Sequence, residues 1–356
     1  MMKRWSVVKR LMPLFAGLVL LLSACGREDL SALNPQGPIA EQQFDLMTLA
    51  ITIMLLVVVV VFGICIFVIF RFRRKKGQND IPVQVEGNHK LEVIWTVIPI
   101  ILLIILAVPT VKYVFAFAED YSDDKENAIL VNVTSHQYWW EFEYPDYGIR
   151  TAQDLVIPIN KKVSVNLKTA DVLHSFWVPS LAGKMDTNTA DNINEMYFEA
   201  REENVYRGKC AELCGPSHAY MDFKVKSVSD ATFTAWVNEM KADPKPFTGD
   251  ADVGEKFKTS CLTCHAIDNV QSMGPNLKGL GSKEAIAGIM LNRENADEPI
   301  DQAKLEENLR KWLVDPQEEK PYNLMPKVEL SERELDQIVD YLANYKLDSL
   351  KEINKE

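Results

Sequence analysis

Thirteen residues, "KCAELCGPSHAYM" at 209–221, contain two cysteines, a glutamate, a histidine and a methionine. Upstream, His174 lies among apolar and aromatic residues in "DVLHSFWVP". Two thiolates and two imidazoles suit a zinc ion, and the two cysteines alone could form a disulfide. Neither alternative uses Met221, whereas thiolate, imidazole and a weak thioether are the ligands of copper electron-transfer sites. Ligand softness therefore favours copper, and two thiolates are enough to bridge two metal ions.

A second motif, "CLTCH", places Cys261, Cys264 and His265 at the spacing of covalent haem c attachment. A redox dithiol or half of a zinc site is the alternative, but no second paired-cysteine motif follows and no βαβ pattern surrounds this one. Haem iron needs a second axial ligand, and Met325 in "YNLMP" is the predicted one. Met273 competes for that role, although it lies in the turn just after the attachment site.

The elements around these motifs differ in type. Short stretches rich in β-branched and aromatic residues predict an all-β sandwich or barrel over 127–232. Residues 251–348 are predicted to be helical, and Ser331 with Glu334 forms a capping-box pattern. Between them, "KADPKPFTGD" at 241–250 indicates a linker, which we expect to tether the two parts at an effective concentration of about 1 mM.

The N-terminal third is predicted to cross a membrane twice. Within a hairpin at 44–118, the spans at about 46–70 and 93–115 are long enough for a hydrocarbon core of about 30 Å. Basic residues gather between the spans, which predicts a cytoplasmic connection and places both termini and the soluble domains on the outer face of a bacterial cell membrane. These basic residues are Arg71, Arg73, Arg74, Lys75, Lys76 and Lys90.

Residues 1–24 combine basic residues with a short apolar run, which is typical of a signal peptide. The small residues before Cys25 resemble a bacterial lipobox, which implies cleavage there, lipid attachment to Cys25 and an extracytoplasmic segment at 25–43. An ordinary signal peptide or a short first membrane helix is the alternative.

"CAELCGPSHAYM", the two spans and the β segment resemble subunit two of the haem-copper cytochrome c oxidases over residues of about 40–232. The resemblance implies a cupredoxin-like domain with a binuclear copper centre (CuA), in which two sulfurs bridge the metals. The backbone carbonyl of Glu212 would be one ligand, and its side chain would bind magnesium or manganese at the junction with the catalytic subunit. The implied copper ligands are His174, Cys210, Glu212, Cys214, His218 and Met221.

The same resemblance implies two further roles. The family has a tryptophan after a His-Gln pair where electrons enter from cytochrome c, but this chain has Tyr138, so Trp139 or Trp140 is an alternative. Such aromatic residues also fill strand cores in ordinary proteins. Glu92 resembles the carboxylate at the mouth of a proton-uptake path, although a helix N-terminus at a membrane surface explains it equally well.

Residues 251–348 resemble the class I cytochrome c domain through "GEKF", "GPNL" and the later "MP". The predicted fold is thus a multidomain membrane protein with a two-helix transmembrane hairpin, an all-β cupredoxin-like domain and an all-α cytochrome c domain. This order resembles the caa3-type oxidases, in which cytochrome c is fused to subunit two.

The resemblance implies the electron-input subunit of a proton-translocating terminal oxidase. Electrons would pass from an external cytochrome c or a quinol–cytochrome c reductase to haem c, to copper and then to catalytic subunit 1, which reduces oxygen among other oxidase subunits. A membrane-anchored copper carrier for oxidase assembly is the alternative, but it gives a covalent haem no role. A quinol oxidase subunit would lack the copper ligands. The formal net charge is −11, and no nucleic-acid partner is expected.

Overall fold

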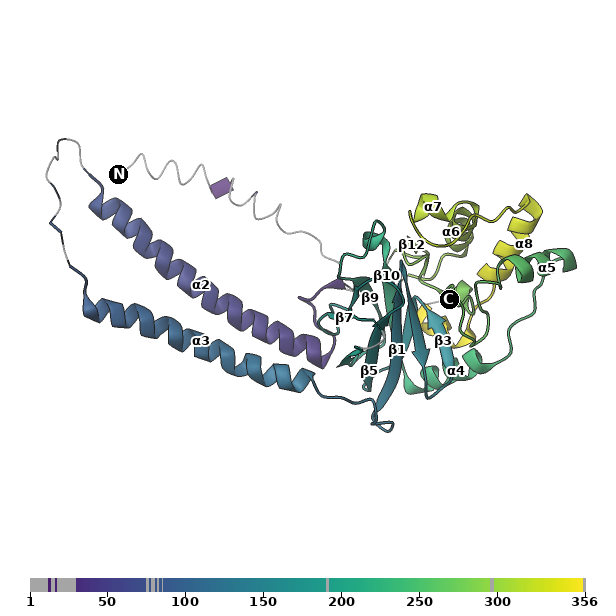
Figure 1. Cartoon of the computed structure of the whole chain (residues 1–356), viewed down its shortest axis with the longest axis horizontal. Coiled ribbons are helices and arrows are strands. Elements are labelled where there is room, and N and C mark those ends of the chain that lie inside the picture. The colour runs from purple at the N-terminus through teal and green to yellow at the C-terminus, as the bar shows by residue number, and fades with distance from the viewer. Residues whose placement is uncertain are drawn as a thin grey trace.

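The computed structural model describes residues 30–74, 86–189, 192–294 and 298–354, together with the isolated positions 12, 13, 17, 77, 81, 83 and 84. Two long helices lie at one end of the molecule, and a β domain followed by a helical domain forms the other end (Figure 1). The predicted lipid-attachment residue Cys25 and nearly all of the predicted signal peptide lie outside the described residues.

The two long helices are α2 (Pro38–Phe72) and α3 (His89–Phe117), which lie side by side as a hairpin (Figure 1). A proline suits the first turn of α2, and the side chain of Asn88 accepts two backbone N–H groups at the start of α3. Both helices are long and apolar enough to cross a membrane, and their apolar side chains face outward, as those of Val59 and Leu103 do.

The start of α2 and the end of α3 are attached directly to the β domain. Near the start of α2, the backbone N–H of Ala40 donates to Leu181 O at 3.1 Å, and the side chain of Ile39 joins the buried core of the β domain. At the end of α3, the hydroxyl of Tyr197 donates to Ala116 O at 3.1 Å. The membrane hairpin therefore holds the β domain at two points.

The β domain is a sandwich of two five-stranded sheets. Its strands are β1 (Ala128–His136), β2 (Trp139–Tyr144), β3 (Ile149–Ala152), β4 (Asp154–Pro158), β5 (Lys162–Thr169), β6 (His174–Trp177), β7 (Met185–Thr187), β8 (Asn194–Phe198), β9 (Asn204–Cys210) and β10 (Asp222–Val228). The sheet orders are β3-β2-β1-β5-β8 and β4-β10-β9-β6-β7. Neighbouring strands are antiparallel except for the parallel pairs β1 with β5 and β4 with β10.

Aromatic side chains fill the space between the sheets. The rings of Phe176 and Phe223 stack with centroids 4.8 Å apart, and Trp140 lies 5.2 Å from Phe223. Gly208 on β9 passes so close to the Phe223 ring that a Cβ atom there would lie 2.1 Å from it. Any larger residue at this position would displace the core, since interiors are packed at crystal-like density.

A helix closes the β domain beyond its predicted limit at residue 232. Helix α4 (Asp230–Lys241) begins at the capping side chain of Ser229 and buries Phe233 and Trp236. The Trp236 ring lies 5.2 Å from that of Tyr144 on β2. The helix therefore extends the core of the sandwich and leads the chain toward the next domain.

The C-terminal domain is mainly helical and surrounds its own apolar core. The predicted capping box of Ser331 and Glu334 is confirmed at the start of the penultimate helix. The elements are α5 (Ala251–Ser260), η3 (Leu280–Ser282), β11 (Ala285–Ile286), β12 (Met290–Leu291), α6 (Gln302–Val314), α7 (Pro316–Glu319), α8 (Glu332–Ala343), η4 (Asp348–Leu350) and α9 (Lys351–Asn354). The short β11–β12 hairpin departs from the all-α expectation, because Ala287 and Gly288 both take positive φ angles that suit a tight hairpin turn.

The linker predicted at 241–250 packs against α8. Tyr341 OH on α8 donates to Lys245 O at 2.8 Å, and the Phe247 ring lies 4.9 Å from the Tyr341 ring. The backbone N–H of Asp250 donates to Gln337 Oε1 at 2.7 Å. Aromatic packing and satisfied backbone groups therefore hold these residues against α8.

A buried cluster of charges joins the two domains. Lys226 on β10 is fully buried, and its Nζ lies 3.0 Å from Glu284 Oε1 and 3.3 Å from Asp154 Oδ2. Arg293 completes the cluster by donating from Nε and Nη2 to the two carboxylate oxygens of Glu284, at 2.6 and 2.8 Å. Opposite charges thus compensate one another between the β domain and the helical domain, which fixes how the domains sit.

Candidate metal and haem sites

Residues 210–221, here called the cysteine loop, connect two neighbouring antiparallel strands. Strand β9 ends at Cys210 and β10 begins just after Met221. On the other side of β9, Cys210 is in register with Phe176 of β6, so His174 at the start of β6 lies near the same edge. Sheet pairing therefore brings a histidine from a distant part of the sequence to the loop.

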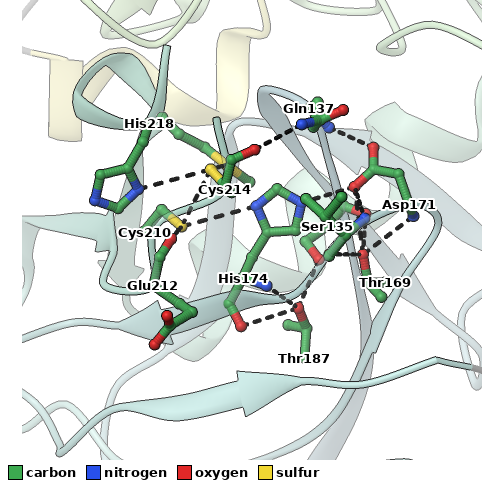
Figure 2. Close-up of polar contacts among 12 residues, drawn as sticks. Ser135, Gln137, Thr169, Asp171, His174, Thr187, Cys210, Glu212, Cys214 and His218 are labelled. Carbon is green, nitrogen blue, oxygen red and sulfur yellow. Dashed lines mark hydrogen bonds and ion pairs between the residues drawn. The ribbon is translucent and has the colours of Figure 1, made fainter. Parts of the chain in front are cut away.

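Two imidazole nitrogens face two different sulfurs (Figure 2). His174 Nδ1 lies 3.8 Å from Cys210 Sγ, and His218 Nδ1 lies 3.6 Å from Cys214 Sγ. The two sulfurs are 3.9 Å apart, nearly twice the length of a disulfide bond of about 2.05 Å. Both cysteines are free and buried, so the disulfide alternative is not present in this structure.

Two further predicted ligands lie at the same place. Met221 Sδ is 3.9 Å from Cys214 Sγ, and the backbone carbonyl of Glu212 is 3.2 Å from Cys210 Sγ. The carboxylate of Glu212 points away from the sulfurs (Figure 2). Six donors thus converge, and a single tetrahedral zinc ion would leave the thioether and the carbonyl unused.

Residues outside the predicted ligand set hold the His174 ring. Asp171 Oδ1 lies 2.8 Å from His174 Nε2, and Thr187 Oγ1 accepts the backbone N–H of His174 at 3.2 Å. Gln137 Nε2 donates to Cys214 O at 2.6 Å and fixes the cysteine loop (Figure 2). Sequence reasoning missed these supports, because only the three-residue spacing of Asp171 and His174 gave any local signal.

The electrostatics of the cysteine loop favour an anionic sulfur. The pKa of Cys210 is lowered, first by its contact with Cys214 and then by His174, which together outweigh burial. The pKa of Cys214 is raised, first by its contact with Cys210, then by burial and by the negative charge of that neighbour. Burial lowers the pKa of His174, but its contacts with Asp171 and Cys210 raise it more. A cation placed between the sulfurs would relieve both effects, since metal ligation requires thiolates.

The aromatic run after β1 is divided between two faces. Trp140 is fully buried, its ring lies 6.2 Å from His174 and its Nε1 donates to Met221 O at 3.4 Å. Tyr138 is also buried beside the cysteine loop. Trp139 instead stacks on His136, with ring centroids 4.1 Å apart.

The CxxCH motif begins where α5 ends, and Cys261 and Cys264 are both free. His265 Nδ1 donates to Pro275 O at 2.8 Å, which leaves Nε2 as the free imidazole donor, and burial lowers the pKa of this histidine. A Cβ on Gly274 would lie 2.9 Å from the His265 ring. The turn after the motif therefore fixes the orientation of this ring.

The two candidate methionine ligands differ sharply in their surroundings. Met325 packs against the apolar core of the helical domain, and Trp312 Nε1 donates to its Sδ at 3.1 Å. Met273 is 74% exposed. This contrast favours Met325 as the axial ligand, and Trp312 is a support that the sequence pattern did not indicate.

Glu92 lies in the first turn of α3, where its carboxylate is 3.8 Å from His89 Nδ1 and half-exposed. Neither its predicted role in proton uptake nor a second cation at Glu212 is tested by these contacts, and both stay predictions.

Three family models match separate parts of the chain. The model described as cytochrome C oxidase subunit II, transmembrane domain, matches residues 32–113, and that for the periplasmic domain of the same subunit matches 148–228. The cytochrome c model matches 251–346. The order of the matches agrees with the hairpin, the β domain and the helical domain.

Curated relatives match over almost the whole chain. Cytochrome c oxidase subunit 2 of Bacillus sp. (strain PS3) is 49% identical, with 95% of this chain and 98% of the relative covered. The same subunit of Bacillus subtilis (strain 168) is 44% identical over 98% of this chain and its own full length. Quinol oxidase subunit 2 of Bacillus subtilis (strain 168) is 34% identical, and that match covers 65% of this chain and 72% of the relative.

The fold and these matches define a subunit of a membrane-anchored oxidoreductase complex. The chain belongs to the cytochrome c oxidase subunit 2 family, in the form that carries a C-terminal cytochrome c domain. Its role is electron input to the oxidase.

Proposed function

We propose that electrons enter this chain at a covalently bound haem c, pass to a binuclear copper centre in the cysteine loop and leave for the catalytic subunit. Cys261 and Cys264 would attach the haem, and His265 and Met325 would ligate its iron. The copper ligands would be His174, Cys210, Cys214, His218, Met221 and the carbonyl of Glu212.

One observation carries this proposal: two Nδ1 atoms face two different sulfurs, and those sulfurs lie side by side. A pair of bridging thiolates with one imidazole for each metal matches this arrangement. When bound, the copper pair supplies one-electron storage with little change in bond lengths. The residues of the chain supply fixed geometry: Asp171 orients His174, Gln137 holds Cys214 O, and the buried Trp140 excludes water.

The remaining predictions extend the same proposal. The connection between α2 and α3 would lie in the cytoplasm, with the soluble domains outside and Cys25 lipidated. The Glu212 carboxylate, which points away from the sulfurs, is free to bind magnesium or manganese at the surface shared with catalytic subunit 1 (Figure 2). An external cytochrome c or a quinol–cytochrome c reductase would reduce the haem, and the oxidase would reduce oxygen and move protons.

Metal analysis and spectroscopy of the full-length chain test the proposal. We expect two copper atoms and one haem per chain, with a mixed-valence copper signal. Cys210→Ser should abolish that signal and electron transfer to the catalytic subunit while the haem stays attached. Cys65→Ser is the matched control, because Cys65 lies on α2 away from both sites. Stoichiometric zinc, a single copper atom, or normal turnover of Cys210→Ser would contradict the proposal and favour a copper carrier or a different metal.

A further inference from the structure

The chain just after α7 lies against the β domain. Lys320 is only 2% exposed, and its Nζ donates to Tyr138 O at 2.6 Å and to Ala287 O at 2.8 Å. The next carbonyl group, Pro321 O, accepts the hydroxyl of Ser217 at 2.5 Å. Two consecutive residues of the helical domain thus contact the β domain beside the cysteine loop.

Both contacts continue into the cysteine loop. Ser217 is itself a loop residue, next to His218. Tyr138 follows Gln137, whose side chain donates to Cys214 O at 2.6 Å. Two separate connections therefore lead from residues 320–321 to the loop that carries the two sulfurs.

In the other direction, the same residues are held to Met325. Asn323 Nδ2 donates to Lys320 O at 2.7 Å, and Asn323 Oδ1 accepts the backbone N–H of Met325 at 2.8 Å. Residues 320–325, here called the Met325 segment, therefore form a short hydrogen-bonded unit. One end of this unit carries the candidate iron ligand, and the other end touches the cysteine loop.

Burying Lys320 costs free energy, which argues against an incidental contact. An ammonium group loses its hydration when buried, and this loss is offset only by good hydrogen bonds or a counter-ion. Within the described part of the chain, no carboxylate lies within ion-pair distance of Lys320, so two backbone carbonyls are its partners. One carbonyl belongs to the β domain and the other to the helical domain, so the side chain links the two domains across their interface.

We propose that Lys320 and Ser217 are positioning residues that pin the Met325 segment onto the cysteine loop and so form the contact through which electrons pass from haem to copper. The inference rests on the proposed function. The step moves one electron from ferrous iron to the oxidised copper pair, with no bond formed or broken and no proton required. The same contact covers Tyr138, which is 3% exposed, so soluble donors reach the haem rather than this tyrosine.

The test uses the full-length, cofactor-loaded chain after photochemical reduction of its haem. We expect Lys320→Met and Ser217→Ala each to slow copper reduction about tenfold, or about 1.4 kcal/mol in activation free energy, with haem and copper contents unchanged. Lys258→Met is the matched control, because Lys258 on α5 is exposed. Hydrogen–deuterium exchange gives a second readout, in which both variants should raise exchange in residues 320–325 even before copper is loaded.

The outcomes separate the inference from the proposed function. If the wild-type chain holds no copper pair, or its haem does not reduce the copper, the proposed function fails. If the wild-type chain transfers electrons and both variants transfer them equally fast with unchanged exchange, the positioning role is overturned. Should Lys320→Met fail to fold, Ser217→Ala, which removes a single hydroxyl oxygen, decides the question.

Discussion

Asp171 Oδ1 lies 2.8 Å from His174 Nε2, on the side of the imidazole ring opposite Cys210. A carboxylate behind a ligating histidine fixes the tautomer and makes the facing nitrogen a stronger donor. The same contact raises the pKa of His174 against the effect of burial. Support of this kind can be tested without altering any proposed copper ligand.

Asp171→Asn should weaken copper binding by about 10- to 100-fold, because the amide cannot stabilise the imidazole as a carboxylate does. The measurement is a competition titration of the full-length chain with a copper chelator. Asp186→Asn on β7 is the control, since its side chain is exposed. Equal affinity in both variants would show that Asp171 has no part in the site.

Met325→Ala should lower the reduction potential of the haem, because methionine opposite histidine raises it. Redox titration and the methionine–iron absorption band of the full-length chain provide the measurement. Met273→Ala should leave both unchanged, since Met273 is 74% exposed. A shift in Met273→Ala but not in Met325→Ala would transfer the axial role to Met273.

Glu284→Gln should destabilise the docked domains by about 3–5 kcal/mol, because it leaves Lys226 and Arg293 buried without their shared carboxylate. Thermal unfolding of the full-length chain measures the loss, and proteolysis at the linker reports domain separation. Glu255→Gln on α5, an exposed site, serves as the control. Wild-type stability and protease resistance in Glu284→Gln would mean that this cluster does not hold the interface.

Lys224 on β10 provides a prediction about pH. Its Nζ is buried and has no hydrogen-bond partner among the described residues, and burial, followed by nearby Arg207, lowers its pKa from 10.5 to about 8. The unfolded chain keeps this proton up to its ordinary pKa, whereas the folded chain releases it above about 8. The free energy of unfolding therefore rises as the pH increases from about 8 to 10.5. This gain in stability is lost again as the pH falls back through that range to about 8.

Lys224→Met should remove the free-energy cost of burying the charged ammonium group. At pH 7 the variant should be more stable than the wild type by an amount on the order of 3 kcal/mol, and the difference should shrink toward zero near pH 10.5. Thermal unfolding of both chains across this pH range is the measurement, with Lys241→Met on the exposed end of α4 as the control. A difference that does not change with pH would contradict the lowered pKa.

Local sequence spacing predicted the cysteine loop well, because four of its proposed ligands, Cys210, Cys214, His218 and Met221, lie within twelve residues. His174 was found by its aromatic surroundings, and sheet pairing explains why it arrives at the loop. The CxxCH motif and the Ser331 capping box were predictable for the same reason: their partners are neighbours in the chain.

The contacts between the domains could not be predicted in this way. Lys224 and Lys226 alternate with apolar residues on β10, a pattern typical of a strand with one face in water. The helical domain covers that face, and the partner Glu284 is far away in the sequence. Likewise, nothing in "KPYNLMP" indicates that Lys320 is buried, because its hydrogen-bond acceptors are Tyr138 O in the turn between β1 and β2 and Ala287 O in the β11–β12 turn.

The direct attachment of α2 to the β domain has a mechanical consequence. Ala40 bonds to Leu181 and Ile39 enters the sandwich core, so no slack chain separates the lipid-facing helix from the soluble part (Figure 1). Together with the docked helical domain, the β domain and α2 should move as one rigid unit. A bilayer whose thickness tilts α2 would therefore change the height of the cysteine loop above the lipid, and with it the gap to the catalytic subunit.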